Sequence, residues 1–460
     1  MRRAAAPLVV LLLLLSAAPA RALTPDDPGL LTLAAAGGGT TSLPDQWWAP
    51  QSGFLSAWDL VDGRGATVAV IDTGVDGAHP EIAPVLRAAV DQDSDPSRGP
   101  ATVDENGHGT HVASIACAAP GNGIGIAGAG NGCGLIVEKT DLTDASIAAS
   151  IRDAVDRGAD AINMSFGTDD DRVASRDVVD AIDRAYARGV VLVAAAADKP
   201  VREQGAPANI LQPRGTAPDI TAGKGLTVTA ATSDDVRAPF AGRGSEISLA
   251  AYGAVAADRG SPGLLGAFPS NSTVLERGGT KDHPAGCGCR TSYHGDSRYA
   301  YLEGTSMAAP QVAATAALMR RMNPDLEAGD IIRLLKRTAR RPAGRGWSPE
   351  LGWGILDADA AVLAARSLDR SAPTSQVVLA APVSGGSVAL RWRGQDGSPP
   401  GVRSTGIARY EVWRKAGGAP AQHMTTTTST SALVPAEPGV RNQWFTVAVD
   451  RQGNRERRRL

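Results

Sequence analysis

The chain has 460 residues, of which 43% are hydrophobic and 20% charged, an ordinary composition for a globular protein of about three domains, or fewer if one is large. The formal net charge of −2 gives no electrostatic basis for binding nucleic acid, so we expect no nucleic-acid partner. The short basic run at 455–459 is interpreted as a solvated terminus.

Residues 1–22 have the pattern of a signal peptide. Arg2 and Arg3 precede an unbroken apolar run at 8–15, and Ala20-Arg21-Ala22 forms a small-residue cleavage site. The apolar run is too short to span a membrane, and no later stretch is longer. We therefore predict a secreted, extracellular protein without a membrane anchor.

Four cysteines suit an oxidising compartment and allow three pairings. We favour disulfides Cys117–Cys133 and Cys287–Cys289. The alternatives are free thiols or a metal site, but a lone Cys-x-Cys without a matching histidine pair is weak evidence for zinc.

The N-terminal half of the chain starts with a short segment, 23–45, followed by an aromatic stretch at 46–59 that we expect to anchor on the surface of a larger domain. Residues 66–71 form a continuous apolar run typical of a buried strand, which ends at Asp72. An acid at the carboxyl end of such a strand lies where open α/β folds place their chemistry. The alternative is an aspartate that caps a turn.

Asn106-Gly107-His108-Gly109 precedes an apolar run and predicts a histidine that opens a helix. A general base needs this access to substrate and a pKa near neutrality, so His108 is a candidate base. His111 follows one turn later, and we expect it to be packed or structural.

Strands and helices then alternate along the chain. The glycine-rich segment at 121–134 lacks a Walker-type Gly-Lys-Ser/Thr, so a phosphate site is not expected. The alternation predicts a mostly parallel α/β sheet covered on both faces. Its expected helices are 146–157, 175–189 and 330–338, its further strands are 160–164, 190–197, 226–231 and 247–251, and its long loop is 253–297.

Gly304-Thr305-Ser306-Met307 reads as a tight turn before a helix. A serine there faces free backbone N–H groups and the positive end of the helix dipole, which suits a nucleophile. The alternative is a serine that only caps a buried helix. A serine nucleophile also needs a base and an orienting group.

Beyond a predicted linker at 367–375, short β-rich runs occur at 388–392, 408–415, 425–434 and 443–449. Their spacing predicts a small β-sandwich at 376–460. Trp413 and Trp444 are the expected anchors of its core.

Three motifs resemble those of the subtilisin-like serine proteases (subtilases), in that family's order: VAVIDTGVD at 68–76, NGHGTHVASIA at 106–116 and EGTSMAAPQVAATAAL at 303–318. The resemblance implies a subtilisin-like three-layer α/β peptidase domain at 46–366. The segment 376–460 is similar to fibronectin type III-like modules. We expect it to bind protein or polysaccharide; the alternative is a spacer that packs on or near the protease.

The resemblance implies a serine endopeptidase acting on proteins or peptides, with Ser306 as nucleophile, His108 as base and Asp72 orienting the imidazole. It also implies that Ser165, Phe166 and Gly167 pair with substrate and wall a specificity pocket. Residues 195–197, with Ala195 and Ala197, match the opposite wall, and no catalytic cofactor is implied.

Asp198 departs from the family, which usually has an asparagine here whose amide helps to bind the oxyanion. Loss of that donor costs about 10²–10³ in turnover. We hypothesise an active enzyme favoured by mildly acidic pH, in which Asp198 is protonated and His108 is still neutral. The alternative is a catalytically lapsed scaffold that binds peptides.

Two further features bear on the family comparison. The segment 23–43 is too short for the family's usual propeptide. The family's calcium loop is partly recognisable, with Glu81 and Asn122 as side-chain ligands of a structural Ca²⁺. The alternative is a glycine-rich turn with no ion.

Overall fold

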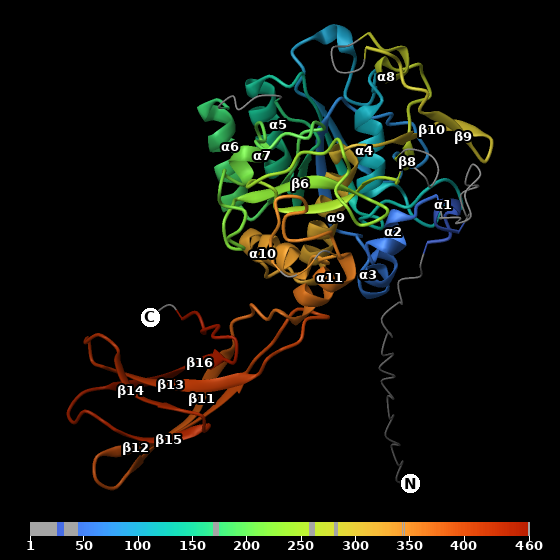
Figure 1. The fold of residues 1–460 in the computed structure, drawn as a ribbon. Coiled ribbons are helices and arrows are strands. Elements are labelled where there is room, and N and C mark those ends of the chain that lie inside the picture. The colour runs from blue at the N-terminus through green and yellow to red at the C-terminus, as the bar shows by residue number, and fades with distance from the viewer. Residues whose placement is uncertain are drawn as a thin grey trace, which may run out of the picture.

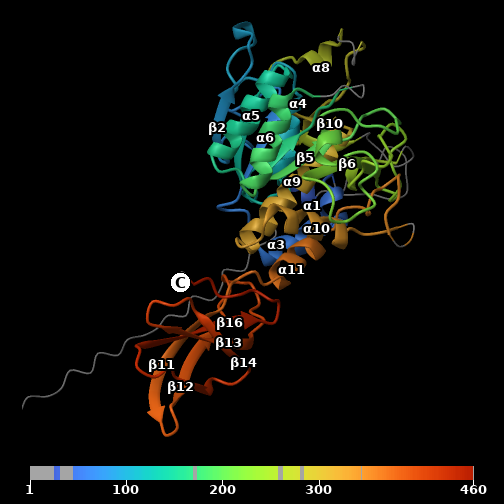
Figure 2. The same cartoon turned by 90° about the vertical axis from the view of Figure 1, so that its left-hand side faces the viewer.

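The computed structural model describes residues 25–31, 45–168, 174–256, 263–279, 284–342, 344 and 346–458. The predicted signal peptide, 1–22, lies outside these residues. Within the described ranges, no helix has the length and apolar character needed to cross a membrane. Figures 1 and 2 show a large α/β unit followed by a smaller β unit at the C-terminal end of the chain.

The large unit is built on a seven-stranded parallel sheet with the order β2-β3-β1-β4-β5-β6-β7. The predicted strands after residues 66, 160, 190, 226 and 247 are confirmed, within a few residues. Two further strands, β2 and β3, were not predicted. The strands are β1 Thr67–Asp72, β2 Leu86–Asp91, β3 Gly134–Lys139, β4 Ala161–Met164, β5 Val191–Ala195, β6 Gly225–Thr232 and β7 Leu249–Ala254.

Alternate residues of each central strand enter different cores, because successive side chains point to opposite faces of a sheet. Val68 and Val70 pack into the core formed with α4 and α9, whereas Ala69 and Ile71 pack into the core formed with α5, α6 and α7. This arrangement confirms the predicted three-layer fold. The helices are α4 His108–Cys117 and α9 Thr305–Met322 on one face, and α5 Asp144–Asp156, α6 Arg176–Ala187 and α7 Ala208–Leu211 on the other.

Further helices extend the α9 side of the sheet. Trp48, Phe54 and Trp58 are fully buried there, so the aromatic stretch belongs to the main core and is not a surface anchor. Trp58 Nε1 also donates to the carbonyl of Ala129 at 2.9 Å. These elements are α1 Pro28–Leu31, α2 Trp48–Gln51, α3 Phe54–Leu60, α10 Ala328–Thr338 and α11 Ala358–Ser367, with a 3-10 turn at Pro96–Arg98.

The predicted loop at 253–297 contains short elements of secondary structure, which the sequence analysis did not predict. It contains β8 Leu264–Ala267, α8 Val274–Arg277, β9 Arg290–Tyr293 and β10 Asp296–Leu302, and its strands form an antiparallel sheet in the order β8-β10-β9. The predicted pairing of the cysteines is confirmed: Cys117 is joined to Cys133, and Cys287 to Cys289.

The C-terminal unit contains two three-stranded antiparallel sheets, β11-β12-β15 and β14-β13-β16. Trp392 is the buried tryptophan of its core and Trp444 packs at the margin, whereas Trp413 lies on the other face of β13 and stacks on Phe445. The prediction of Trp413 as a core anchor is therefore wrong. The strands are β11 Thr374–Val383, β12 Ser387–Gln395, β13 Ile407–Ala416, β14 Gln422–Thr427, β15 Ser431–Pro435 and β16 Asn442–Asp450.

Candidate active site

The candidate catalytic residues come from elements that end or begin at one edge of the parallel sheet. Asp72 is the last residue of β1, and its neighbour Ile71 is in register with Met164 of β4. Ser165, the residue after Met164, exchanges hydrogen bonds with Ser306 on α9. The carboxyl ends of β1 and β4 therefore bring Asp72 and Ser306 to the same edge, although they are far apart in the sequence.

Asp72 and His108 are in direct contact. Asp72 Oδ1 lies 2.8 Å from His108 Nδ1 and accepts a second hydrogen bond from the Thr73 backbone N–H at 2.8 Å. Asp72 is almost completely buried, while the His108 side chain is 25% exposed. Asp72 thus holds the imidazole at Nδ1, and the side chain stays partly exposed to solvent. A general base needs such exposure to reach its substrate.

Glycine at position 109 permits this contact. A Cβ at Gly109 would lie 2.2 Å from the carbonyl oxygen of Gly74, and real Cβ atoms essentially never come so close. The backbone of α4 can therefore approach the turn after β1 only without a side chain here. The Gly109 N–H also donates to Thr73 Oγ1 at 3.0 Å.

The environment of His108 raises its pKa. Burial opposes the charged imidazolium, but the charge and hydrogen bond of Asp72, with further negative charge from Asp104 and Asp198, outweigh it. Only neutral His108 can accept a proton. Because its pKa is raised, His108 becomes protonated, and stops acting as a base, at a higher pH than an ordinary histidine does as the pH falls.

We expect kcat/KM for a peptide substrate to fall as pH decreases, with a midpoint above the ordinary histidine value of about 6.5, because kcat/KM reports the pKa of the free enzyme's base. A pH series on the purified protein measures this midpoint. A midpoint below about 6.5 would contradict the electrostatic role given to Asp72.

Ser306 is the second residue of α9 and is 9% exposed. Its Oγ donates to the carbonyl oxygen of Ser165 at 3.1 Å, and Ser165 Oγ donates back to the Ser306 carbonyl at 2.9 Å. In this conformation the Ser306 hydroxyl donates to Ser165, so its proton must leave that carbonyl before it can pass to His108. Catalytic hydrogen bonds often form only once substrate is bound.

Asp198 follows β5 and lies at the start of α9. Its Oδ1 accepts hydrogen bonds from the Thr305 backbone N–H at 2.8 Å and from Thr305 Oγ1 at 2.9 Å, and the residue is exposed. The hypothesis of an enzyme favoured by mildly acidic pH, in which Asp198 is protonated and His108 is still neutral, stays a prediction.

The predicted substrate residues occupy two positions at this edge of the sheet. Phe166 and Gly167 line a pocket that is open to solvent, whose other walls are mainly apolar and come from Leu142, Ile147, Ala174, Val178, Ala206 and Pro207. Ala195 is buried in the core beneath α9, and Ala197 is half-buried with its N–H donating to Gln204 Oε1 at 3.0 Å.

Sequence analysis missed Asp104. This aspartate is buried, and its two oxygens accept hydrogen bonds from Thr73 Oγ1, from Thr110 Oγ1 and from the N–H groups of Asn106, Gly107 and Thr110. It fixes the start of α4 and therefore the place of His108. The sequence signal that could have found it is an acidic residue three positions before Gly107-His108.

Glu81 and Asn122 contact each other, remote in the fold from the sheet edge that holds Asp72. Asn122 Nδ2 donates to Glu81 Oε2 at 3.1 Å, while Glu81 Oε1 accepts from the Ile126 N–H and the Tyr299 hydroxyl, both at 2.9 Å. Burial raises the pKa of Glu81 to about 7. Carboxylate and amide oxygens are the kind of ligand that Ca²⁺ prefers, and calcium binding by these two residues stays a prediction.

Comparison with known proteins agrees with this geometry. Residues 63–354 match the subtilase family, Peptidase S8. Thermitase from Thermoactinomyces vulgaris is 30% identical over 66% of this chain and 89% of its own length, and subtilisin DY from Bacillus licheniformis is 30% identical over 65% and 91%. The solved structure of a protease from Pseudoalteromonas arctica has a TM-score of 0.57 at 27% identity, covering 75% of this chain and 100% of that one.

The family match covers more than half of the chain. Together with the order of the seven-stranded sheet and the position of Asp72, His108 and Ser306 at its edge, it defines the class of protein. The chain belongs to the subtilase family and is a subtilisin-like serine endopeptidase.

Proposed function

We propose that the protein is secreted and hydrolyses peptide bonds of proteins or peptides through the triad Asp72, His108 and Ser306, with an acyl-enzyme intermediate. The observation that carries this proposal is the 2.8 Å contact between Asp72 Oδ1 and His108 Nδ1, at the sheet edge where α9 presents Ser306.

In the proposed reaction, the Ser306 hydroxyl gives up its hydrogen bond to the Ser165 carbonyl, and its Oγ attacks the carbonyl carbon of the scissile peptide. His108 Nε2 takes the hydroxyl proton, and Asp72 stabilises the imidazolium through Nδ1–H. The tetrahedral adduct collapses, and the leaving amine takes the proton from His108. Water then repeats these steps on the acyl-enzyme and restores Ser306.

The substrate class follows from the pocket beside Phe166. Its lining is mainly apolar, and Asp144 is its one acidic member. We therefore propose that it accepts an apolar side chain of an extended peptide, because burial of apolar surface contributes about 25 cal/mol per Å².

The proposed nucleophile is tested by labelling with a fluorophosphonate, which reacts with activated serines. Wild type is expected to be labelled at neutral pH, and Ser306→Ala to remain unlabelled. Labelling of both proteins would place the reactive group elsewhere. Absence of labelling in folded wild type from mildly acidic to alkaline pH would favour the lapsed, peptide-binding alternative.

Asp198→Asn is expected to raise kcat at neutral pH by up to about 10²–10³-fold. The asparagine keeps the carbonyl oxygen that accepts from Thr305 and replaces Oδ2, the oxygen next to Gly304, by an N–H donor for the oxyanion. Steady-state kinetics on a peptide substrate measure the change.

Asp198→Ala is the matched control, because it removes the charge without adding a donor. Its gain in kcat should be clearly smaller than that of Asp198→Asn. Equal gains would show that removal of negative charge, and not the new donor, accounts for the effect.

We further propose the domain limits 46–366 for the peptidase and 376–460 for a fibronectin type III-like module that contacts protein or polysaccharide. In support, the strands form two sheets, β11-β12-β15 and β14-β13-β16. Residues from both sheets pack in one core around Trp392, as in a β-sandwich. The predicted linker already contains the start of β11 at Thr374.

A further inference from the structure

The turn that leads into His108 is held by the first residues of α8. The N–H of Val274 donates to the carbonyl oxygen of Glu105 at 2.8 Å, and the N–H of Leu275 donates to that of Asn106 at 3.3 Å. Asn106 in turn accepts the backbone N–H of His108 on its Oδ1 at 3.2 Å. These two N–H groups at the start of α8 thus fix Glu105 and Asn106, the residues directly before Gly107.

The same turn is packed from the side by Phe268 and Thr273. Gly107 has φ +98°, and a Cβ there would lie 2.6 Å from the Phe268 ring and 3.1 Å from Thr273 Cγ2. Phe268 and Thr273 are themselves fully buried. The backbone that presents His108 therefore has no room to move toward the β8–β10 segment.

Arg290 fixes α8 and Phe268 with all five of its N–H donors. Two bonds run to Glu276 of α8, from Nε to Oε1 at 2.6 Å and from Nη2 to Oε2 at 2.7 Å. The other three reach the carbonyls of Pro269, Asn271 and Ser297 at 2.8, 2.8 and 2.9 Å. The guanidinium also lies 5.0 Å from the centre of the Phe268 ring.

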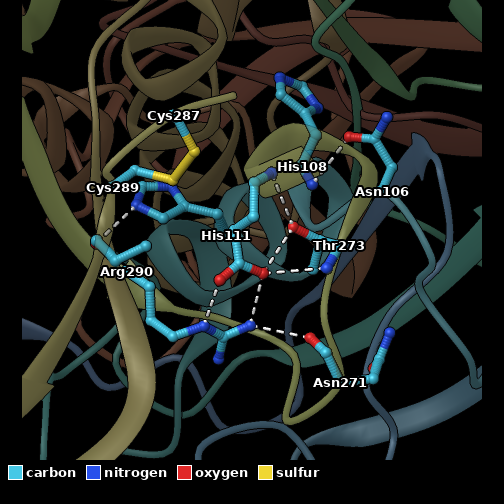
Figure 3. Close-up of a disulfide and its surroundings, with 10 residues drawn as sticks. Asn106, His108, His111, Asn271, Thr273, Cys287, Cys289 and Arg290 are labelled. Carbon is cyan, nitrogen blue, oxygen red and sulfur yellow. Dashed lines mark hydrogen bonds and ion pairs between the residues drawn. A yellow bond between two sulfur atoms is a disulfide. The ribbon is translucent and has the colours of Figure 1, made fainter. Parts of the chain in front are cut away.

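Glu276 connects this pair to the start of α8. Its carboxylate accepts hydrogen bonds from the backbone N–H and the hydroxyl of Thr273, which caps the helix. The pKa of Glu276 is lowered to about 2, chiefly by its hydrogen bonds to Arg290, so the ion pair persists at all working pH values. Figure 3 shows Arg290, Thr273 and His108 in this order, beside the disulfide of Cys287 and Cys289.

We propose that Arg290 and Glu276 are positioning residues for His108: their ion pair holds α8 against residues 105 and 106, and α8 in turn holds the imidazole in register with Asp72 and Ser306. The inference rests on the proposed role of His108 as the base. Neither side chain is hydrogen-bonded to Asp72, His108 or Ser306, so we assign them an effect on geometry, where a displacement of about 1 Å can cost about 10²-fold in rate.

Two variants test the proposal. Glu276→Gln keeps the size of the side chain and removes its charge and one acceptor, and Arg290→Met removes all five donors while keeping an apolar stem over Phe268. Active sites are first titrated with the fluorophosphonate, so that kcat is expressed per reactive serine. We expect kcat per site to fall about tenfold in Glu276→Gln and up to about 100-fold in Arg290→Met, with KM within about twofold of wild type.

Arg298→Met is the matched control. Arg298 belongs to the same small sheet and forms a similar bidentate pair with Asp296, but its side chain is bonded to no residue of α8 or of the turn at 105–107. Its removal should leave kcat per site and KM within about twofold of wild type.

A role limited to folding would lower the melting temperature and the number of titratable sites but would leave kcat per site unchanged. That result in Glu276→Gln and Arg290→Met would overturn the proposal. If Arg290→Met fails to fold, Glu276→Gln decides alone. If wild type itself is not labelled, the proposed function fails, whereas an active wild type with unaffected variants refutes only the positioning role.

Discussion

Replacing Ser306 with alanine is expected to lower kcat for peptide hydrolysis by about six orders of magnitude. The substitution removes the nucleophile and the hydrogen bond to the Ser165 carbonyl, and leaves only binding and the remaining polarisation of the substrate. Alanine is a better helix former than serine and Ser306 lies within α9, so the fold should persist. The measurement compares kcat of wild type and of the variant at saturating substrate. The melting temperatures of both proteins are the control for folding.

The double variant Ser306→Ala/His108→Ala provides the sharper test. A base without its nucleophile has nothing to activate, so the second substitution should add almost no loss, because triad members act as a unit. Losses that multiply would mean that His108 serves a reaction step independent of Ser306.

The second large effect is expected for Asp72→Asn, which should lower kcat by about 10⁴-fold. In wild type, Asp72 Oδ1 accepts from both His108 Nδ1 and the Thr73 N–H, while Oδ2 is buried and has no hydrogen-bond partner among the described residues. An asparagine that keeps its oxygen toward His108 buries an unsatisfied NH₂ group. The flipped amide donates to Nδ1 and forces the tautomer in which Nε2 carries the proton, so the base is lost.

Asp160→Asn is the matched control for Asp72→Asn. Asp160 precedes β4 at the opposite end of the same sheet, where its Oδ2 accepts the backbone N–H of Thr67 at 2.9 Å. We expect kcat to stay within about threefold of wild type there. If Asp72→Asn also retained activity within about tenfold, another group would have to orient His108.

The candidate triad could be predicted from sequence because each member is next to an element with a strong local pattern. Asp72 ends a continuous apolar strand, and His108 and Ser306 open helices that follow glycine. Their contacts could also be anticipated, since carboxyl ends of parallel strands lie at one edge of the sheet. The motifs then specified the family, which the comparisons confirm.

Two of the elements that were missed lack such a pattern. β2, at the edge of the sheet, is only partly buried, and β9 has the polar sequence Arg-Thr-Ser-Tyr. Both are held by pairing with neighbours that are distant in sequence, which no local periodicity reveals. For the same reason sequence alone did not link Glu276 to Arg290, or Asp198 to Thr305.

The buried position of α9 has a consequence for the lifetime of the enzyme. All but two of its 18 residues are buried, and it packs against strands of the central sheet as well as carrying Ser306. Exposing the nucleophile's helix thus requires opening the main core, not the fraying of a surface element. Cleavage within α9 should therefore require global unfolding, so that substitutions which slow unfolding protect this helix without altering the chemical step.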